Sequence, residues 1–196
     1  MDHGNPERLK ALCGRRLIIA VGGGVAAYKV AGLVSTCVQA GAEVLVSMTE
    51  AATRFVTPLT FEAIAGCPVF LDPWNPPDRA DPQHVRLVRD LDLMIVAPCT
   101  MDLLARLAAG MADDAVTLLA SVIDRSKTPT LLAPSMNETM WHQPATQRNL
   151  RTLREDGFTI VEPAEGWHAC RTGGAGRLPE PEALVDAMIA RLPDRA

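Results

Sequence analysis

The chain has 196 residues, a length that suits one domain built around a single core. Hydrophobic residues make up 48% of it and aromatic residues only 4%, so we expect the mostly aliphatic core of a parallel β-sheet covered by helices. The net charge is −4, with 19 Lys and Arg against 23 Asp and Glu, and no basic stripe is present. These charges argue against nucleic acid as a partner.

The apolar segments and the cysteines limit the other classes of protein. The first strongly apolar segment, residues 17–21, is too short for a signal peptide, and no segment approaches a membrane span. We therefore expect a cytoplasmic protein without membrane contact. The five cysteines include no CxxC pair, which argues against a disulfide framework and a structural zinc site, and we predict no metal site.

In chain order, strand patterns alternate with helix patterns after a polar N-terminal segment. We expect residues 1–15 to be a disordered extension and residues 16–196 to form one domain. Apolar runs predict strands at residues 17–21, 43–48, 68–71, 93–97, 129–133 and 158–161. Periodicity and caps predict helices at residues 25–40, 58–65, 84–92, 103–109, 112–123, 144–156 and 182–192, and a helical turn at 49–55. The alternation is typical of an α/β fold with a doubly wound parallel sheet, Rossmann- or flavodoxin-like, and residues 162–181 read as a C-terminal glycine-rich flap.

Three glycines, Gly22 to Gly24, separate the first predicted strand from the first long helix. Backbone N–H groups in such a turn can approach a phosphate closely at a helix N-terminus. The signal is weak alone, because Ala27 replaces the third glycine of a G-x-G-x-x-G fingerprint. Ser47 and Thr49 follow at the end of the neighbouring predicted strand, so we expect them to reach the same ligand.

The stretch from Pro134 to Trp141 reads Pro-Ser-Met-Asn-Glu-Thr-Met-Trp and follows a buried strand. An amide flanked by large apolar side chains suits the wall of a ligand pocket. The alternative is that Met136, Met140 and Trp141 plug the core beneath a turn, and on the loop alone that alternative is favoured.

Three further side chains are candidates for chemistry: His84, Asn137 and Cys170. A lone histidine is usually structural, and a lone cysteine in a glycine-rich flap can be incidental. The predicted fold nevertheless places the ends of its strands, and the loops that follow them, at one edge of the sheet.

With these motifs the chain resembles the flavin-dependent cysteine decarboxylases, and among them the phosphopantothenoylcysteine decarboxylases. The most specific motif is the Pro-x-Met-Asn-x-x-Met-Trp string at residues 134–141. The other motifs are the glycine turn with the four residues after it, His84, residues 97–100, 110–113, 169–170 and 176–181. The resemblance covers roughly residues 16–192.

The resemblance implies a bound FMN at the carboxyl ends of the strands. Its phosphate is expected near Gly23, Gly24, Val25, Ala26 and Ser47. Its ring is expected near Thr49, Phe55, Pro98, Cys99 and Thr100. In the implied reaction the flavin oxidises the CH₂–SH group of a cysteine derivative to a thioaldehyde, which then accepts the electrons left by departing CO₂.

The resemblance also implies roles for the three candidates. His84 is the catalytic histidine that handles a proton, Asn137 orients the substrate, and Cys170 donates a proton when the enethiol is reduced to the saturated thiol. The implied substrate-binding residues are Arg89, Asn137, Met140 and Arg171. Arg89 matches a family position that binds substrate across a subunit boundary, so we expect a homotrimer or a larger homo-oligomer.

The expected function is decarboxylation of 4′-phosphopantothenoylcysteine, a small-molecule substrate, to 4′-phosphopantetheine in coenzyme A synthesis. Two alternatives remain open: oxidative decarboxylation of a peptide's C-terminal cysteine, and a silent flavin-binding regulatory subunit. Cys170 favours complete turnover, and the presence of all three candidates argues against the silent subunit. Because the chain ends without the synthetase domain fused to many bacterial relatives, we expect a stand-alone enzyme.

The chain departs from the family pattern at three places. Arg171 and Thr172 stand where Gly-Asp is common, and Arg171 is a candidate ligand for the substrate phosphate, a solvated side chain being the alternative. Asp102 and Asp114 place carboxylates where amides are usual, so we expect altered contacts to the flavin ring.

Overall fold

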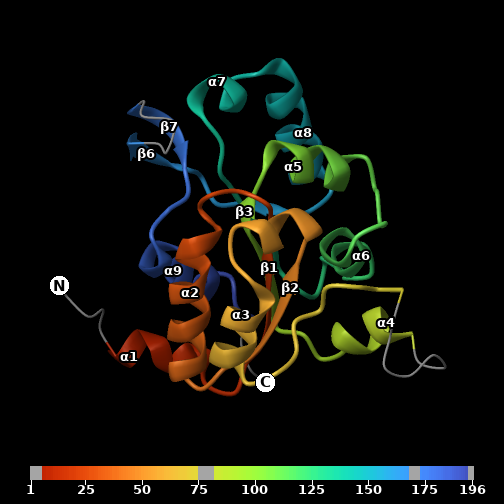
Figure 1. Cartoon of the computed structure of the whole chain (residues 1–196), viewed down its shortest axis with the longest axis vertical. Helices are drawn as coiled ribbons and strands as arrows, with labels where there is room; N and C mark the ends of the chain where they lie inside the picture. Colours follow the sequence, from red (N-terminus) through yellow and green to blue (C-terminus); the bar gives the residue numbers. More distant parts are fainter. Residues whose placement is uncertain (1–5, 75–81, 168–172, 194–196) are drawn as a thin grey trace.

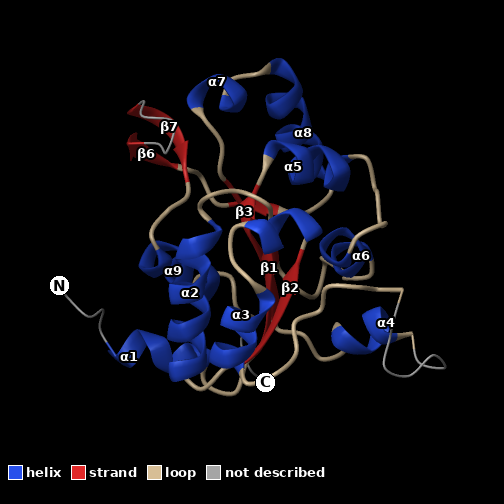
Figure 2. Cartoon of the chain, in the orientation of Figure 1, coloured by secondary structure: helices blue, strands red, loops and turns tan. Residues whose placement is uncertain are grey.

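The structure, a computed structural model, describes residues 6–74, 82–167 and 173–193. Within these residues five strands form a central sheet in the order β2-β1-β3-β4-β5 (Figures 1 and 2). They are β1 (Arg16–Val21), β2 (Glu43–Met48), β3 (Leu93–Cys99), β4 (Thr130–Pro134) and β5 (Thr159–Ile160). Every neighbouring pair in this sheet is parallel. The predicted flavodoxin-like fold is confirmed, since this is the flavodoxin strand order.

Helices cover both faces of the sheet. The first face carries α2 (Ala27–Gln39), α3 (Pro58–Ala65) and α9 (Pro181–Ile189). The second carries α5 (Met101–Ala108), α6 (Ala115–Ser121) and α8 (Pro144–Glu155). Strand β1 is apolar on both sides and therefore needs helices on both faces. Leu17 and Ile19 belong to the first core, and Ile18 and Ala20 belong to the second. No helix in the described residues is long and apolar enough to cross a membrane.

The prediction of a disordered N-terminal extension is wrong for residues 6–15. They form α1 (Pro6–Leu9), the 3-10 helix η1 (Lys10–Leu12) and a turn into β1. Leu12 is completely buried in the first core, and burial of one such side chain stabilises a fold by roughly 1.5–3 kcal/mol. Arg15 is buried as well, and its guanidinium binds the Asp92 carboxylate at 2.7 Å and the carbonyl of Pro193 at 2.8 Å. The segment is mostly polar in composition, so its residue types do not indicate that Leu12 and Arg15 are buried.

The strand predicted at residues 68–71 is reduced to a single bridge. Phe70 alone pairs with β2, where its N–H donates to the carbonyl of Val46 at 2.9 Å. Pro68 has no N–H to donate, so the ladder does not extend toward the start of this segment.

Two short helices differ from the sequence expectation. Helix α4 (Gln83–Leu87) ends five residues before the predicted 84–92 helix does, and Asp90 beyond it adopts a φ of 55° that a continuing helix excludes. The loop at residues 134–141 contains α7 (Glu138–Trp141), which the sequence did not predict.

The predicted flap contains an antiparallel hairpin of β6 (Ala164–Trp167) and β7 (Gly173–Arg177). Its second strand meets the loop before α7, where the N–H of Met136 donates to the carbonyl of Gly176 at 2.9 Å. Figure 1 shows the hairpin and α7 at the same end of the molecule, beyond the carboxyl ends of the strands.

Candidate active site

The loop after β1 meets the last residues of β3 at the carboxyl edge of the sheet, where the strand order reverses. The N–H of Gly22 donates to the carbonyl of Pro98 at 3.2 Å. A Cβ on Gly22 would lie 2.2 Å from that carbonyl oxygen, and a Cβ on Gly23 would lie 2.4 Å from the Cβ of Ala51. The close approach of these segments therefore requires glycine at both positions, and in this sheet topology ligands bind at this reversal.

The glycine turn presents backbone donors. Among the described residues, the N–H groups of Gly23, Val25 and Ala26 donate to no acceptor. These residues line a cavity immediately before α2, so their N–H groups and the positive end of the helix dipole favour an anion there.

Two hydroxyl groups stand beside this turn at the ends of β2 and β3. Thr49 Oγ1 accepts from the N–H of Ala52 and thereby caps η2 (Glu50–Arg54), at 3.2 Å. Thr100 Oγ1 accepts from the N–H of Leu103 and caps α5, also at 3.2 Å. Each hydroxyl is fixed by its cap through an acceptor lone pair, and its own proton stays available to a ligand.

The larger cavity at this edge, which we name the Asn137 cavity, has a volume of about 690 Å³. It joins the glycine turn to the loop before α7 and to the last strand of the flap hairpin. Its principal lining residues are Gly23, Gly24, Val25, Ala26, Tyr28, Lys29, Thr100, Met101, Asp102, Ser135, Met136, Asn137, Met140, Arg177 and Leu178.

Asn137 is held at the start of α7. Its Oδ1 accepts from the N–H of Met140 at 2.8 Å, so the carbonyl half of the amide caps the helix. The loop is tied to α8 by Thr146, whose hydroxyl donates to the carbonyl of Met140 at 2.7 Å, and by Gln147, whose amide donates to the carbonyl of Trp141 at 2.8 Å. The Nδ2 donors of Asn137 are thus carried on a fixed loop at the cavity wall.

Two cations share one carboxylate on the flap side of the same cavity. Glu180 Oε1 accepts from Lys29 Nζ at 2.9 Å and from Arg177 Nη2. Lys29 and then Arg177 hold the pKa of the Glu180 carboxyl below its usual value. Lys29 Nζ also donates to the carbonyl of Leu178 at 3.2 Å, which fixes its position at the cavity wall.

A second cavity of about 530 Å³, which we name the Thr49 cavity, adjoins the first through Gly23, Thr100 and Asp102. Its other charged lining residues are Glu50, Arg106, Asp113 and Asp114. Acidic groups therefore outnumber the single arginine at this cavity.

Asp114, one of the departures from the family pattern, has a structural task beside the Thr49 cavity. Its Oδ1 accepts from the N–H groups of Val116 and Thr117 and caps α6, and its Oδ2 accepts from Arg106 at 3.0 Å. An aspartate at this position therefore serves both a helix N-terminus and a partly buried ion pair.

The structure brings together only part of the predicted site. Gly23, Gly24, Val25, Ala26, Thr100, Asn137 and Met140 line the Asn137 cavity, and Thr49 lines the adjoining one. The Pro98 carbonyl accepts from the glycine turn, and Pro98 Cγ would lie 3.8 Å from a Cβ on Gly24. Cys170 and Arg171 lie outside the described residues.

Three residues assigned to the flavin line neither cavity at the carboxyl edge. Ser47 is completely buried and lines neither cavity, and its hydroxyl has no hydrogen-bond partner among the described residues. Cys99 is also completely buried, which raises the pKa of its thiol, and its carbonyl accepts from Ser135 at 3.0 Å. Phe55 ends η2 with about half of its surface exposed and lines neither cavity.

His84 and Arg89 are not near Asn137 within one chain. His84 lies in α4 and Arg89 in the turn after it, and neither lines a cavity at the carboxyl edge. Figure 1 shows α4 and α7 at well-separated places in the molecule.

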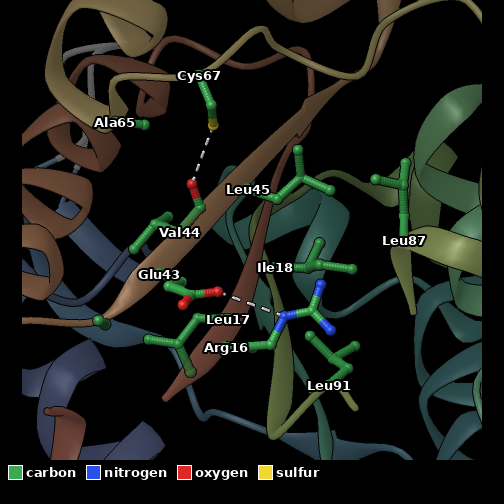
Figure 3. Close-up of a pocket in the computed structure, with 11 residues that line it drawn as sticks. Arg16, Leu17, Ile18, Glu43, Val44, Leu45, Ala65, Cys67, Leu87 and Leu91 are labelled. Atoms are coloured by element: carbon green, nitrogen blue, oxygen red, sulfur yellow. Dashed lines mark hydrogen bonds and ion pairs between the residues drawn. The ribbon is translucent and has the colours of Figure 1, made fainter. Parts of the chain in front are cut away.

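A third cavity, of about 440 Å³, lies at the opposite end of β1 and β2 (Figure 3). Leu87 and Leu91, which flank the Arg89 turn, form part of its wall. Arg16 pairs with Glu43 at 3.5 Å and donates through Nη1 to the carbonyl of Arg89. The segment that carries His84 and Arg89 is therefore anchored to the amino edge of the sheet.

Sequence reasoning missed Lys29 and Arg177 as site residues. Both belong to motifs that carry the family resemblance, but their types alone predict solvated cations. A signal was available for Lys29, because it lies in the first turn of α2, directly after the glycine turn.

Comparison with known proteins gives the family. The sequence pattern of the family described as Flavoprotein matches residues 7–193. The chain belongs to the Flavoprotein family. Its fold agrees with a PPC decarboxylase mutant complexed with pantothenoylaminoethenethiol, with a TM-score of 0.79 and 30% identity, over 89% of this chain and 96% of that one. It also agrees with the FMN-dependent cysteine decarboxylase SpaF, with a TM-score of 0.76 and 31% identity, over 92% of this chain and 98% of that one.

A curated relative of this flavoprotein is the coenzyme A biosynthesis bifunctional protein CoaBC of Vibrio cholerae. The two are 42% identical over 177 residues, which are 90% of this chain and 44% of CoaBC. The chain thus spans less than half the length of this relative, and it is homologous to the decarboxylase region.

Proposed function

We propose that this flavoprotein is an FMN-dependent decarboxylase that converts 4′-phosphopantothenoylcysteine to 4′-phosphopantetheine in coenzyme A synthesis. The observation that carries the proposal is that Asn137 and Met140 line one cavity with the Gly23 to Ala26 turn. The similarity to CoaBC and to a decarboxylase complexed with a pantothenoyl compound supports this choice of substrate.

The residues at the carboxyl edge fit FMN. The three N–H groups of Gly23, Val25 and Ala26 would hold its phosphate, and Thr49 and Thr100 offer hydroxyl protons to the rest of the molecule. FMN bound there would supply the two-electron chemistry by which the substrate's CH₂–SH group is oxidised before CO₂ leaves and reduced afterwards.

Asn137 orients the substrate in this proposal. Its Oδ1 is occupied by the cap of α7, so only Nδ2 is directed to ligand binding, and Nδ2 donates to a carboxylate or an amide carbonyl of the substrate. Met136, which is buried, and Met140 supply the apolar wall that excludes water around this contact.

His84 and Arg89 act from a second copy of the chain in this proposal. Their separation from the Asn137 cavity within one chain supports this arrangement, because a proton acceptor must come within hydrogen-bond reach of the group it serves. A symmetric homo-oligomer, which we propose is a trimer or larger, would repeat the completed site at each equivalent interface.

Cys170 returns the proton at the end of the cycle in this proposal. The variant Cys170→Ser should decarboxylate the substrate and accumulate the enethiol, because a hydroxyl is a far weaker acid than a thiol. Mass analysis of the quenched reaction measures the product. Wild-type yields of the saturated thiol from this variant would contradict the assignment, and Cys67→Ser, remote from both edge cavities, is the matched control.

The second candidate substrate is a peptide with a C-terminal cysteine. The structural similarity to SpaF favours keeping it as a competitor. Parallel assays of both substrates under anaerobic conditions discriminate between them, because only one should release CO₂ at an enzymatic rate.

A further inference from the structure

One end of the Asn137 cavity carries a pair of cations from distant parts of the chain. Lys29 comes from α2 and Arg177 from the last residue of β7, and both line the cavity. The Lys29 side chain is only 9% exposed, so its ammonium group is held in a largely desolvated place. A buried cation is costly unless a negative partner compensates it.

The single carboxylate beside these two cations cannot balance the positive charge of both. Glu180 Oε1 accepts from Lys29 and from Arg177, so two positive charges share one carboxylate that is about half exposed. The remaining lining carboxylate, Asp102, belongs to α5 and also faces the Thr49 cavity. The flap side of the Asn137 cavity is therefore its positive end.

The Thr49 cavity has the opposite charge. Glu50, Asp102, Asp113 and Asp114 face one cation, Arg106, which already binds Asp113 and Asp114. An anionic group on a ligand that spans the edge of the sheet is repelled from this cavity and attracted to the end where Lys29 and Arg177 lie.

The backbone also makes room for Arg177. A Cβ on Gly166, in the facing strand β6, would lie 3.0 Å from Arg177 Nη1. The guanidinium therefore lies across a position without a side chain, while Glu180 fixes its other nitrogen. A planar guanidinium held in this way presents a fork that matches the oxygens of a phosphate.

We propose that Arg177, assisted by Lys29, binds the phosphate monoester of the substrate and so selects phosphorylated over unphosphorylated pantothenoylcysteine. This inference rests on the proposed function and adds a specificity-determining residue to it. Arrival of the dianion gives the two cations a second negative partner beside Glu180 and removes their excess of positive charge.

The test compares two substrates in FMN-loaded protein: 4′-phosphopantothenoylcysteine and pantothenoylcysteine. Arg177→Gln should lower kcat/KM for the phosphorylated substrate by roughly 10- to 100-fold, as expected for a lost hydrogen bond to a charged group, and should lower kcat/KM for the unphosphorylated substrate by a much smaller factor. Arg154→Gln is the matched control, since Arg154 is also exposed and paired, with Glu162 at 2.7 Å, but lines neither cavity.

Two further measurements distinguish a loss of phosphate recognition from a folding defect and from a loss of FMN. Arg177→Lys keeps the charge and should retain part of the preference, which guards against a folding defect in the glutamine variant. The dissociation constant of FMN should be the same in wild type and both variants. An equal loss for both substrates, or a weakened FMN affinity with an intact preference, would overturn the inference. Inactivity of the wild type on both substrates would instead reject the proposed function.

Discussion

The side-chain amide of Asn137 has a structural half and a chemical half. Its Oδ1 caps α7, and its Nδ2 lies on a loop fixed to α8 through Thr146 and Gln147. Because the two halves use different atoms, substitutions can separate them.

Asn137→Asp keeps an acceptor for the cap and removes the donors. We expect the free energy of unfolding to change by less than about 0.5 kcal/mol, whereas Asn137→Ala should lower it by about 1 kcal/mol through loss of the cap. Turnover should fall by about 100-fold or more in both, since a carboxylate repels the substrate carboxylate and alanine offers no donor. Urea unfolding and steady-state kinetics measure the two effects, and wild-type turnover by the aspartate variant would refute the role of Nδ2.

At the residue scale, the sequence motif at residues 134–141 predicted side chains that line the Asn137 cavity. Residues whose surroundings come from distant parts of the chain were harder to place. Asn137 and Met140 were predicted from the string and do line the cavity. Ser47 was predicted from its place near a strand end; its side chain is completely buried and lines neither cavity at the carboxyl edge, so its assignment to the flavin phosphate stays a prediction. Arg177 was missed because the hairpin brings Gly166 beside it and Lys29 comes from α2 to the same carboxylate, Glu180.

The glycine turn and η2 fit together as two elements with no space between them. A Cβ on Gly23 would lie 2.4 Å from the Cβ of Ala51 and 2.9 Å from its carbonyl carbon. A Cβ on Gly24 would meet nothing nearer than Thr100 Cγ2 at 3.6 Å, an ordinary contact. The two adjacent glycines therefore differ in what they tolerate.

Gly23→Ala should destabilise the protein without FMN by about 1–3 kcal/mol, because the turn and η2 must move apart. Gly24→Ala should change its stability by less than about 1 kcal/mol and serves as the matched control. Chemical denaturation of both variants measures the difference. Equal stability of the two variants would show that the turn and η2 are not packed as closely as described.

At the element scale, most strands and helices follow from local pattern, and the exceptions depend on distant contacts. Strands β1 and β3 are nearly continuous apolar runs, and Gly41 and Gly66 end α2 and α3 as expected, both with positive φ. The N-terminal helices could not be predicted, because Leu12 is ordered by the first core and Arg15 by Asp92.

The molecule as a whole places the candidate chemistry at two separated sites. Asn137 and the glycine turn lie at the carboxyl edge of the sheet, whereas α4 and the Arg89 turn are anchored beside the third cavity at the amino edge (Figures 1 and 3). The proposed completion of each site by another subunit follows from this separation.

Mixed oligomers test this completion. His84→Asn and Asn137→Asp should each be inactive alone, but co-expressed subunits should recover activity, since in random mixing about one quarter of the sites pair an intact His84 with an intact Asn137. Activity is measured on hetero-oligomers purified through two tags. Absence of recovery in confirmed hetero-oligomers would place His84 and Asn137 in the same subunit's site.

The most direct measurement of the central claim is anaerobic turnover of 4′-phosphopantothenoylcysteine by the FMN-loaded protein, with mass analysis of the thiol and detection of CO₂. We predict one CO₂ for each 4′-phosphopantetheine formed and no accumulated enethiol. Failure to consume this substrate, by protein that has bound FMN, would contradict the proposed function.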